Sequence, residues 1–180
     1  MATRYQLEAL PLTYPDAPSG LSDAAAAYDA AIIWQRIEAY TVWRWSERTV
    51  EWIVEGDGGD WRPPLAPVEF TSVEVWRGNA WQEATPDPSP FGGFVLDCEG
   101  PYRIRAVVGD NGEPPAAVLE AFRRLAEYMA SDPGKPGASS ESVSAGSVSV
   151  SHSRSAEWQG RAMINSGAAD LLRRYRSVGC

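Results

Sequence analysis

Residues 49–54 read Thr-Val-Glu-Trp-Ile-Val, and the alternation in this stretch decides the β part of the fold. Val50, Trp52 and Val54 occupy every second position, which is the period of a strand with one buried face. The glycines and aspartates of 55–60 supply turn chemistry immediately afterwards. The stretch is therefore predicted to form a strand that ends in a turn.

More short strands follow along the chain at near-regular spacing. Prolines make 62–67 and 85–90 unsuitable for regular ladders, and Gly78-Asn79 is a hairpin signal. Short strands spaced in this way indicate a small antiparallel sheet. The other predicted strands are 68–76, 94–97 and 102–108.

Helices are predicted on both sides of this β region. Ser22 starts an Ala-rich segment, 22–41, with an apolar stripe that predicts a helix. Prolines 114 and 115 suit a helix N-terminus, and apolar residues then recur at three- and four-residue spacing through 114–131. That stripe consists of Val118, Leu119, Phe122, Leu125, Ala126 and Met129.

The remaining segments have other compositions. Prolines in 1–20 predict an extended arm, and the serines and glycines of 132–155 predict a linker or loop. Within that linker, 147–151 alternates Ser and Val, so it is also suited to add as an edge strand to a partner. Residues 156–180 predict interrupted helix, and 171–176 form a basic, apolar tail.

Composition excludes several classes of protein. The 180-residue chain is 44% hydrophobic and 22% charged, as in ordinary soluble domains, and its formal charge of −8 argues against gripping nucleic-acid phosphates. Two cysteines do not make a disulfide framework, and we expect a reducing aqueous setting without a membrane span. Eight tryptophans suggest well-filled cores or subunit contacts.

No catalytic constellation is assigned, so we expect no enzyme, metal or cofactor. His152, the only histidine, lies in the predicted linker without a cysteine or carboxylate at ligand spacing, which favours a solvated side chain. Cys98 is expected to be a small buried thiol rather than a nucleophile paired with His152.

Two groups of acidic residues have a structural interpretation as well as a functional one. Glu55, Asp57 and Asp60 resemble a calcium loop, but the spacing favours a charged hairpin tip. Asp97 and Glu99 are suited to acid–base work in a cleft, but a solvent-facing strand end is the commoner arrangement.

Tryptophans near the predicted sheet favour an alternative, a carbohydrate- or protein-binding module that stays monomeric. Flat aromatic rings stack on sugars. Helices at both ends of the chain argue against this class of mostly all-β modules. The tryptophans concerned are Trp43, Trp45, Trp52, Trp76 and Trp81.

The order of the segments resembles the head–tail connector (adaptor) family of tailed phages and gene transfer agents. One departure is the proline-broken stretch 10–21, where the family has a basic, apolar first helix. The motifs that carry the resemblance are Arg36-Ile-Glu-Ala-Tyr-Thr41, the strand with Trp52, the segment 62–76 with its hairpin, Gly100-Pro-Tyr-Arg-Ile-Arg105, the helix from Pro114, the Ser-rich 140–149 and Leu171-Leu-Arg-Arg-Tyr-Arg176.

The resemblance implies an α+β fold, a small helical bundle with an inserted antiparallel β-sheet or hairpin region and an extended C-terminal segment. Residues 1–131 would form the connector domain, with its β region at 42–110. Residues 132–155 would be a linker, and 156–180 a helical docking segment.

The same resemblance implies a structural subunit of the virion neck, assembled in the cytoplasm of a bacterial host. Twelve copies would form a ring that joins the portal protein to a stopper or tail-terminator protein, and DNA would pass through without specific binding. Expected portal-binding residues are Trp158, Leu171, Leu172, Arg173, Arg174, Tyr175 and Arg176. Expected subunit-interface residues are Trp52, Trp76, Trp81, Val148 and Val150.

Overall fold

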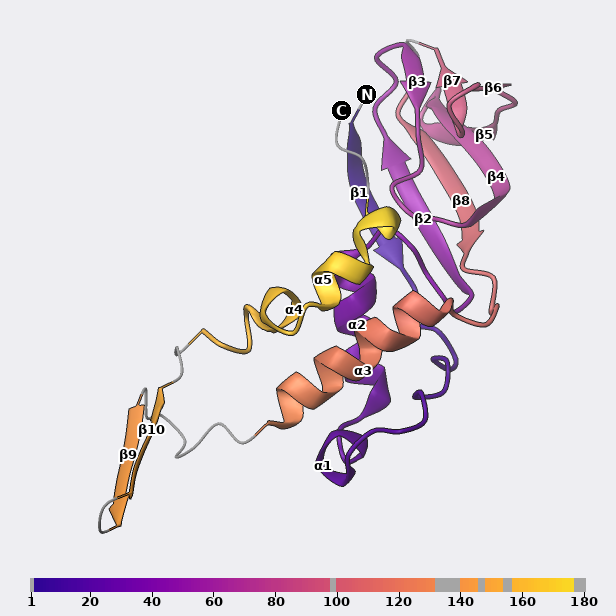
Figure 1. Ribbon diagram of the computed structural model, residues 1–180. Helices are drawn as coiled ribbons and strands as arrows, with labels where there is room; N and C mark the ends of the chain where they lie inside the picture. The colour runs from indigo at the N-terminus through magenta and orange to yellow at the C-terminus, as the bar shows by residue number, and fades with distance from the viewer. Residues whose placement is uncertain (1, 98–99, 132–139, 146–147, 154–156, 177–180) are drawn as a thin grey trace. The chain divides into compact units, whose positions relative to one another are not determined.

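Strand β2 (Arg48–Val54) is the second strand of a five-stranded antiparallel sheet. It pairs with β1 (Thr3–Glu8) on one side and with β8 (Tyr102–Val108) on the other. Strands β4 (Val68–Arg77) and β5 (Ala80–Glu83) complete the order β1-β2-β8-β4-β5, as Figure 1 shows. β1 and β5 are therefore the edge strands of this sheet.

The computed structural model describes residues 2–97, 100–131, 140–145, 148–153 and 157–176, with 140–145 and 148–153 described by their backbone alone. The chain divides into two compact units. Unit 1 contains the residues up to Pro15 and Thr41–Glu113, and unit 2 contains Asp16–Tyr40 and Pro114–Arg176.

A second, three-stranded sheet supplies the rest of the unit 1 core. Its strands are β3 (Gly59–Trp61), β7 (Phe94–Leu96) and β6 (Asp87–Pro88), in the order β3-β7-β6. Trp61 meets Trp52 edge to face, with 5.5 Å between ring centroids. Such aromatic pairs add about 1 kcal/mol to what burial alone contributes. The two sheets therefore share one core, filled mainly by β2, β4 and β8.

Unit 2 is built from short helices around α3 (Ala116–Ala130), whose apolar stripe is buried. The segment predicted as one helix, 22–41, is two helices, α1 (Asp23–Ala26) and α2 (Ala30–Tyr40). The first helix ends at Ala26, and Asp29 starts the second, because its carboxylate accepts the backbone N–H of residue 31 at 2.9 Å. The remaining elements are α4 (Ala162–Asn165), α5 (Ala168–Leu171) and the 3₁₀ turn η1 (Arg173–Tyr175).

Interlocking contacts hold the helices of unit 2 together. The rings of Trp34 on α2 and Phe122 on α3 lie 5.1 Å apart. The Glu127 carboxylate accepts the backbone N–H of Ser22 at 2.7 Å and its hydroxyl at 2.8 Å. These hydrogen bonds lower the pKa of Glu127 and tie α1 to α3.

Residues 132–155, predicted as a linker, contain a β-hairpin of strands β9 (Ser140–Ala145) and β10 (Val148–Ser153). The two strands pair antiparallel, with position 148 opposite 145 and 153 opposite 140. They form a two-stranded sheet of their own among the described strands.

The predicted fold class, a helical bundle with a β insertion, is wrong. Two antiparallel sheets with eight strands dominate the structure, and unit 1 contains no described helix. The prediction treated 1–20 as an arm because of its prolines, but Thr3–Glu8 precedes all of them and forms β1. It also missed β3 and β6, which are too short for a periodic signal.

A shared carboxylate anchors β1 to the chain that leads into β2. Glu8 Oε1 lies 2.6 Å from Nε of Arg44 and 3.2 Å from Nη1 of Arg48, and Glu8 Oε2 accepts a second bond from Arg44 at 3.0 Å. Both arginines are buried. Buried charges cost free energy unless they are paired, so removing the carboxylate has a large cost.

We therefore expect Glu8→Gln to destabilise the protein by roughly 3 kcal/mol in chemical denaturation. The matched control is Glu55→Gln, since Glu55 pairs with Arg4 at 2.8 Å but on the surface. An exposed pair contributes about 0–1 kcal/mol, so the control should change stability little. Equal losses in the two variants would contradict the structural role of Glu8.

Candidate interaction surfaces

The five-stranded sheet has one face in the core and one face outside it. Tyr102, Ile104 and Ala106 of β8 are buried, whereas Arg103 and Arg105 between them are only half-buried. This alternation is typical of an antiparallel sheet with one wet face. We call the outer side the open face.

An arginine–glutamate network crosses the open face from β2 to β4. Arg103 binds both carboxylate oxygens of Glu74, at 2.7 and 2.8 Å. Arg105 bridges Glu51 at 2.8 Å and Glu74 at 3.1 Å. The bidentate hydrogen bonds from Arg103 lower the pKa of Glu74 and, in return, Glu74 raises the pKa of Arg103. These charges satisfy one another, which makes the face rigid rather than reactive.

Two tryptophans continue the open face toward the edge strand β5. Trp76 and Trp81 are cross-strand partners, with ring centroids 5.2 Å apart in an edge-to-face arrangement. The guanidinium carbon of Arg103 lies 4.5 Å from the centroid of Trp81. That ring is therefore covered on one side by a cation, which is a cation–π contact rather than a vacant stacking platform.

The other proposed sugar-stacking tryptophans lie elsewhere. Trp52 and Trp45 are fully buried, and Trp43 is half-buried next to an isolated bridge to Ala66. Trp52 donates its indole N–H to Gln6 of β1 at 2.8 Å. The structure therefore brings only Trp76 and Trp81 together on the open face, and Trp52 is a core residue.

At its β1 end the open face carries two exposed apolar side chains. Tyr5 and Leu7 are opposite Ile53 and Glu51 of β2 in the register, and their side chains are 51% and 56% exposed. A shallow groove of about 410 Å³ runs beside Leu7. Its lining includes Thr49, Glu51, Thr71 and Arg105. Sequence analysis missed this surface, although the alternation of Tyr5 and Leu7 with polar residues was available as a signal.

The C-terminal segment is divided between core and surface. Leu172 is completely buried and Tyr175 nearly so, while Arg173, Arg174 and Arg176 are exposed. Leu171 is half-buried, and so is Trp158, whose ring lies 5.9 Å from that of Tyr128. Arg176 stacks over Tyr40 at 4.8 Å. In this conformation the exposed candidates for portal binding are the three arginines.

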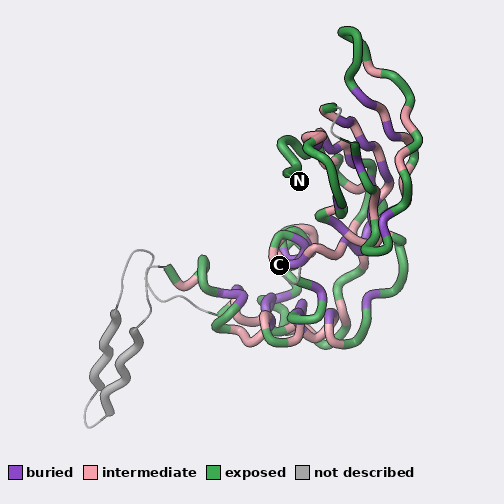
Figure 2. Tube along the Cα trace, turned by 90° about the horizontal axis from the view of Figure 1, so that it is seen from above, coloured by how far each residue is buried: buried purple, intermediate pink, exposed green. Residues whose placement is uncertain are grey.

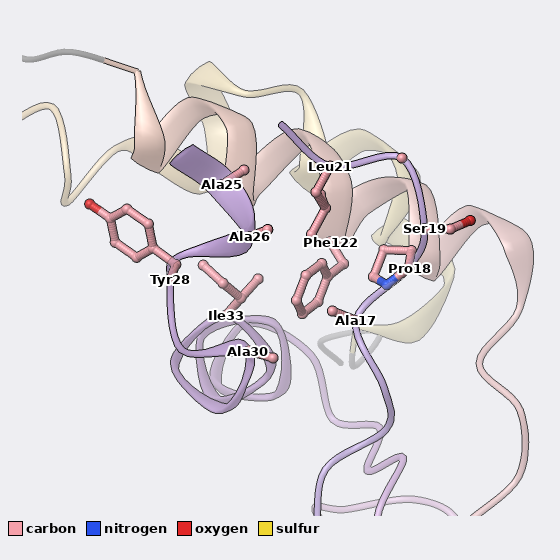
Figure 3. A pocket seen from close by; sticks show the side chains of 11 residues that line it. Ala17, Pro18, Ser19, Leu21, Ala25, Ala26, Tyr28, Ala30, Ile33 and Phe122 are labelled. Carbon is pink, nitrogen blue, oxygen red and sulfur yellow. The ribbon is translucent and has the colours of Figure 1, made fainter. Parts of the chain in front are cut away.

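Unit 2 also has an apolar pocket of about 290 Å³ (Figure 3). Its walls come from the segment 17–21, from α1 and α2, and from Phe122 of α3. Figure 3 shows Leu21, Ile33 and Phe122 directed toward the same space. Its lining contains no charged side chain.

The residues considered for catalysis are not assembled into a site. Cys98 and Glu99 lie outside the described residues, and His152 is described only by its backbone, opposite position 141. Asp60 accepts a short hydrogen bond from Ser89 at 2.5 Å, and Asp57 and Asp97 are exposed. Across the described parts of the chain, no group of three or more His, Cys, Asp or Glu residues is placed to hold a metal.

Among the helices that are described, none has the length and apolar character needed to cross a membrane. Comparison with protein-family models and with curated proteins finds no match to this chain.

For the network on the open face, we expect Arg103→Gln to raise the pKa of Glu74 toward its ordinary value of 4.5. The lowered pKa means that the pair stabilises the fold above pH 4.5, and that this contribution is lost as the pH falls through the folded-state pKa. Carboxyl NMR titration measures the shift. Arg105→Gln is the control and should raise the pKa less, because Arg105 makes one hydrogen bond to Glu74 and Arg103 makes two. An unchanged titration of Glu74 in Arg103→Gln would contradict the assignment.

Proposed function

We propose that this protein is a structural head–tail connector (adaptor) subunit of a tailed phage or gene transfer agent. Copies of the chain would form a ring of about twelve subunits, a number that the family resemblance supplies. The ring would join the portal to a stopper or tail-terminator protein in the virion neck. DNA would pass through its channel without sequence-specific contacts.

The observation that carries the proposal is the hairpin β9–β10, which pairs only with itself among the described strands. An isolated two-stranded hairpin is marginally stable at best in water, and a third strand or a packing partner makes it stable. Half of its residues are serine, with few apolar residues to compensate. A chain that carries such an element between α3 and α4 is suited to assembly with other subunits.

Charge distribution supports the same proposal. The net charge of −8 disfavours tight binding to DNA phosphates. A channel through which DNA slides requires such weak binding. Against that acidic background, the exposed Arg173, Arg174 and Arg176 form a local basic cluster near the C-terminus. Arginine is enriched among residues that carry interface energy, so this cluster is the best-supported part of the predicted portal-binding segment.

The helical bundle expected from the resemblance was wrong, and the connector role is argued without it. That role depends on the order of sequence motifs, on the self-paired hairpin and on the basic cluster. Leu172 and Tyr175 are now assigned to the unit 2 core, so their replacement would test stability rather than docking.

The direct test is the mass of the purified protein in solution, alone and mixed with the portal protein of the same particle. We expect a portal-bound complex with several copies of this chain. Mass photometry and sedimentation velocity both measure its size. A protein that stays monomeric and leaves the portal unbound at micromolar concentration would overturn the connector assignment.

A second test concerns the basic cluster. We expect Arg173→Glu to weaken portal binding by about tenfold, because reversing an interface charge makes an attraction repulsive. Arg161→Glu is a closely matched control in the same unit. Arg161 lies 3.5 Å from Glu157 and Arg173 lies 3.3 Å from Asp170, and all four side chains are at least 68% exposed. Equal losses in titration binding experiments would remove Arg173 from the interface.

A further inference from the structure

Strand β1 has an outer edge that is not paired with any described strand. The N–H of Ala9 bonds to the carbonyl of Thr49 at 3.0 Å, so Tyr5, Leu7 and Ala9 direct their backbone groups toward β2. The intervening Gln6 and Glu8 direct theirs away from β2. No described strand pairs with that side. An exposed edge of this kind is a template for another strand.

The side chains of β1 form two sets, one hydrogen-bonded to unit 1 and one exposed. Thr3, Gln6 and Glu8 are each hydrogen-bonded to a buried tryptophan or arginine of unit 1. Tyr5 and Leu7 carry the exposed apolar surface, and Figure 2 shows the tube exposed along this strand beside the N-terminus. Side chains of β1 are thus bonded to unit 1 residues on one side of the strand, and no described strand pairs with its outer edge.

The hairpin supplies a strand of matching length. β1, β9 and β10 each contain six residues. In the hairpin register, alternate positions are of two kinds. One set holds Val148, Ala145, Val150, Val143, His152 and Glu141, and the other set holds only serine, at 140, 142, 144, 149, 151 and 153.

We propose that β10 of one copy adds to the outer edge of β1 in a second copy. This deepens the connector assignment and rests on it, since it names the contact that joins neighbouring subunits. Backbone hydrogen bonds would supply the affinity, and the two-residue spacing of Val148 and Val150 matches that of Tyr5 and Leu7 on β1. The added hairpin would become part of a seven-stranded sheet across the two copies, which removes its marginal stability.

The geometry of this contact is head to tail. A hairpin from unit 2 of one copy occupies an edge in unit 1 of the next, so every copy has one donor and one acceptor. Contacts of this heterologous type form closed rings when the rotation between copies closes. An isologous dimer would use the same patch on both copies.

Hydrogen–deuterium exchange of the full-length protein tests the pairing directly. We expect the backbone N–H groups of Gln6 and Glu8 within the peptide covering residues 3–8, and the peptide covering 140–153, to exchange fast in dilute monomer. Both should become protected together as the concentration rises or the portal is added. Slow exchange in both peptides at every dilution would mean that the hairpin pairs with its own β1. Assembly without protection of residues 3–8 would also overturn the proposal.

Substitutions with matched controls test which residues of β1 and β10 form the contact. We expect Leu7→Lys and Val150→Lys each to weaken self-association by about tenfold or more, because lysine at either position removes an apolar contact between the two strands. The controls are Leu12→Lys, at a fully exposed leucine outside β1, and Ser149→Lys, one position away in β10. An unchanged unfolding midpoint establishes that Leu7→Lys still folds. Equal effects of variants and controls would overturn the proposal.

Failure of this inference is distinguishable from failure of the connector assignment. Portal-bound rings with unprotected residues 3–8 would leave the connector role intact and discard the β1–β10 contact. Joint protection of residues 3–8 and 140–153 in copies that do not bind the portal would keep the β1–β10 contact and discard the connector role. A protein that neither assembles nor binds portal would discard both.

Discussion

The core of unit 1 contains polar groups whose hydrogen-bond partners lie on its first strand, β1. Gln6 accepts the indole N–H of Trp52, and Thr3 accepts that of Trp61 at 3.0 Å. Glu8 accepts from two buried arginines. A buried polar group without a partner costs roughly 1–3 kcal/mol, more when it is charged, so the sheet depends on the inner row of β1.

The same constraint explains the unusual surface of unit 1. Because the inner row of β1 is committed to the core, alternation places Tyr5 and Leu7 outside, next to an edge whose backbone groups have no described strand partner. The hairpin β9–β10 has the complementary deficiency, two strands where three are needed for stability. Strand pairing between copies would give the β1 edge a partner and would give the hairpin a third strand. The arginine–glutamate network on the open face is already internally satisfied, and so it contributes rigidity more than binding.

The error in fold class has a physical origin. Periodicity detects elements that are long and half-buried, and it found 49–54, 102–108 and the stripe of α3. β3 and β6 contain three and two residues, and they are strands only because their neighbours supply hydrogen-bonding partners. Proline counts in the first twenty residues masked a six-residue strand that ends before the first of those prolines. The family resemblance then assigned the remaining chain to a bundle.

What the sequence determined by itself was local: which stretches alternate, where turns fall, and that a Ser-rich segment separates the long helix from the C-terminal segment. Side-chain chemistry and backbone period are properties of neighbouring residues, so they are readable without a structure. Only the tertiary structure decided that Trp52 is core, that Leu172 and Tyr175 are buried while Arg173 is exposed, and that Tyr5 lies on an edge. Those outcomes depend on contacts between residues far apart in the chain, which no local pattern encodes.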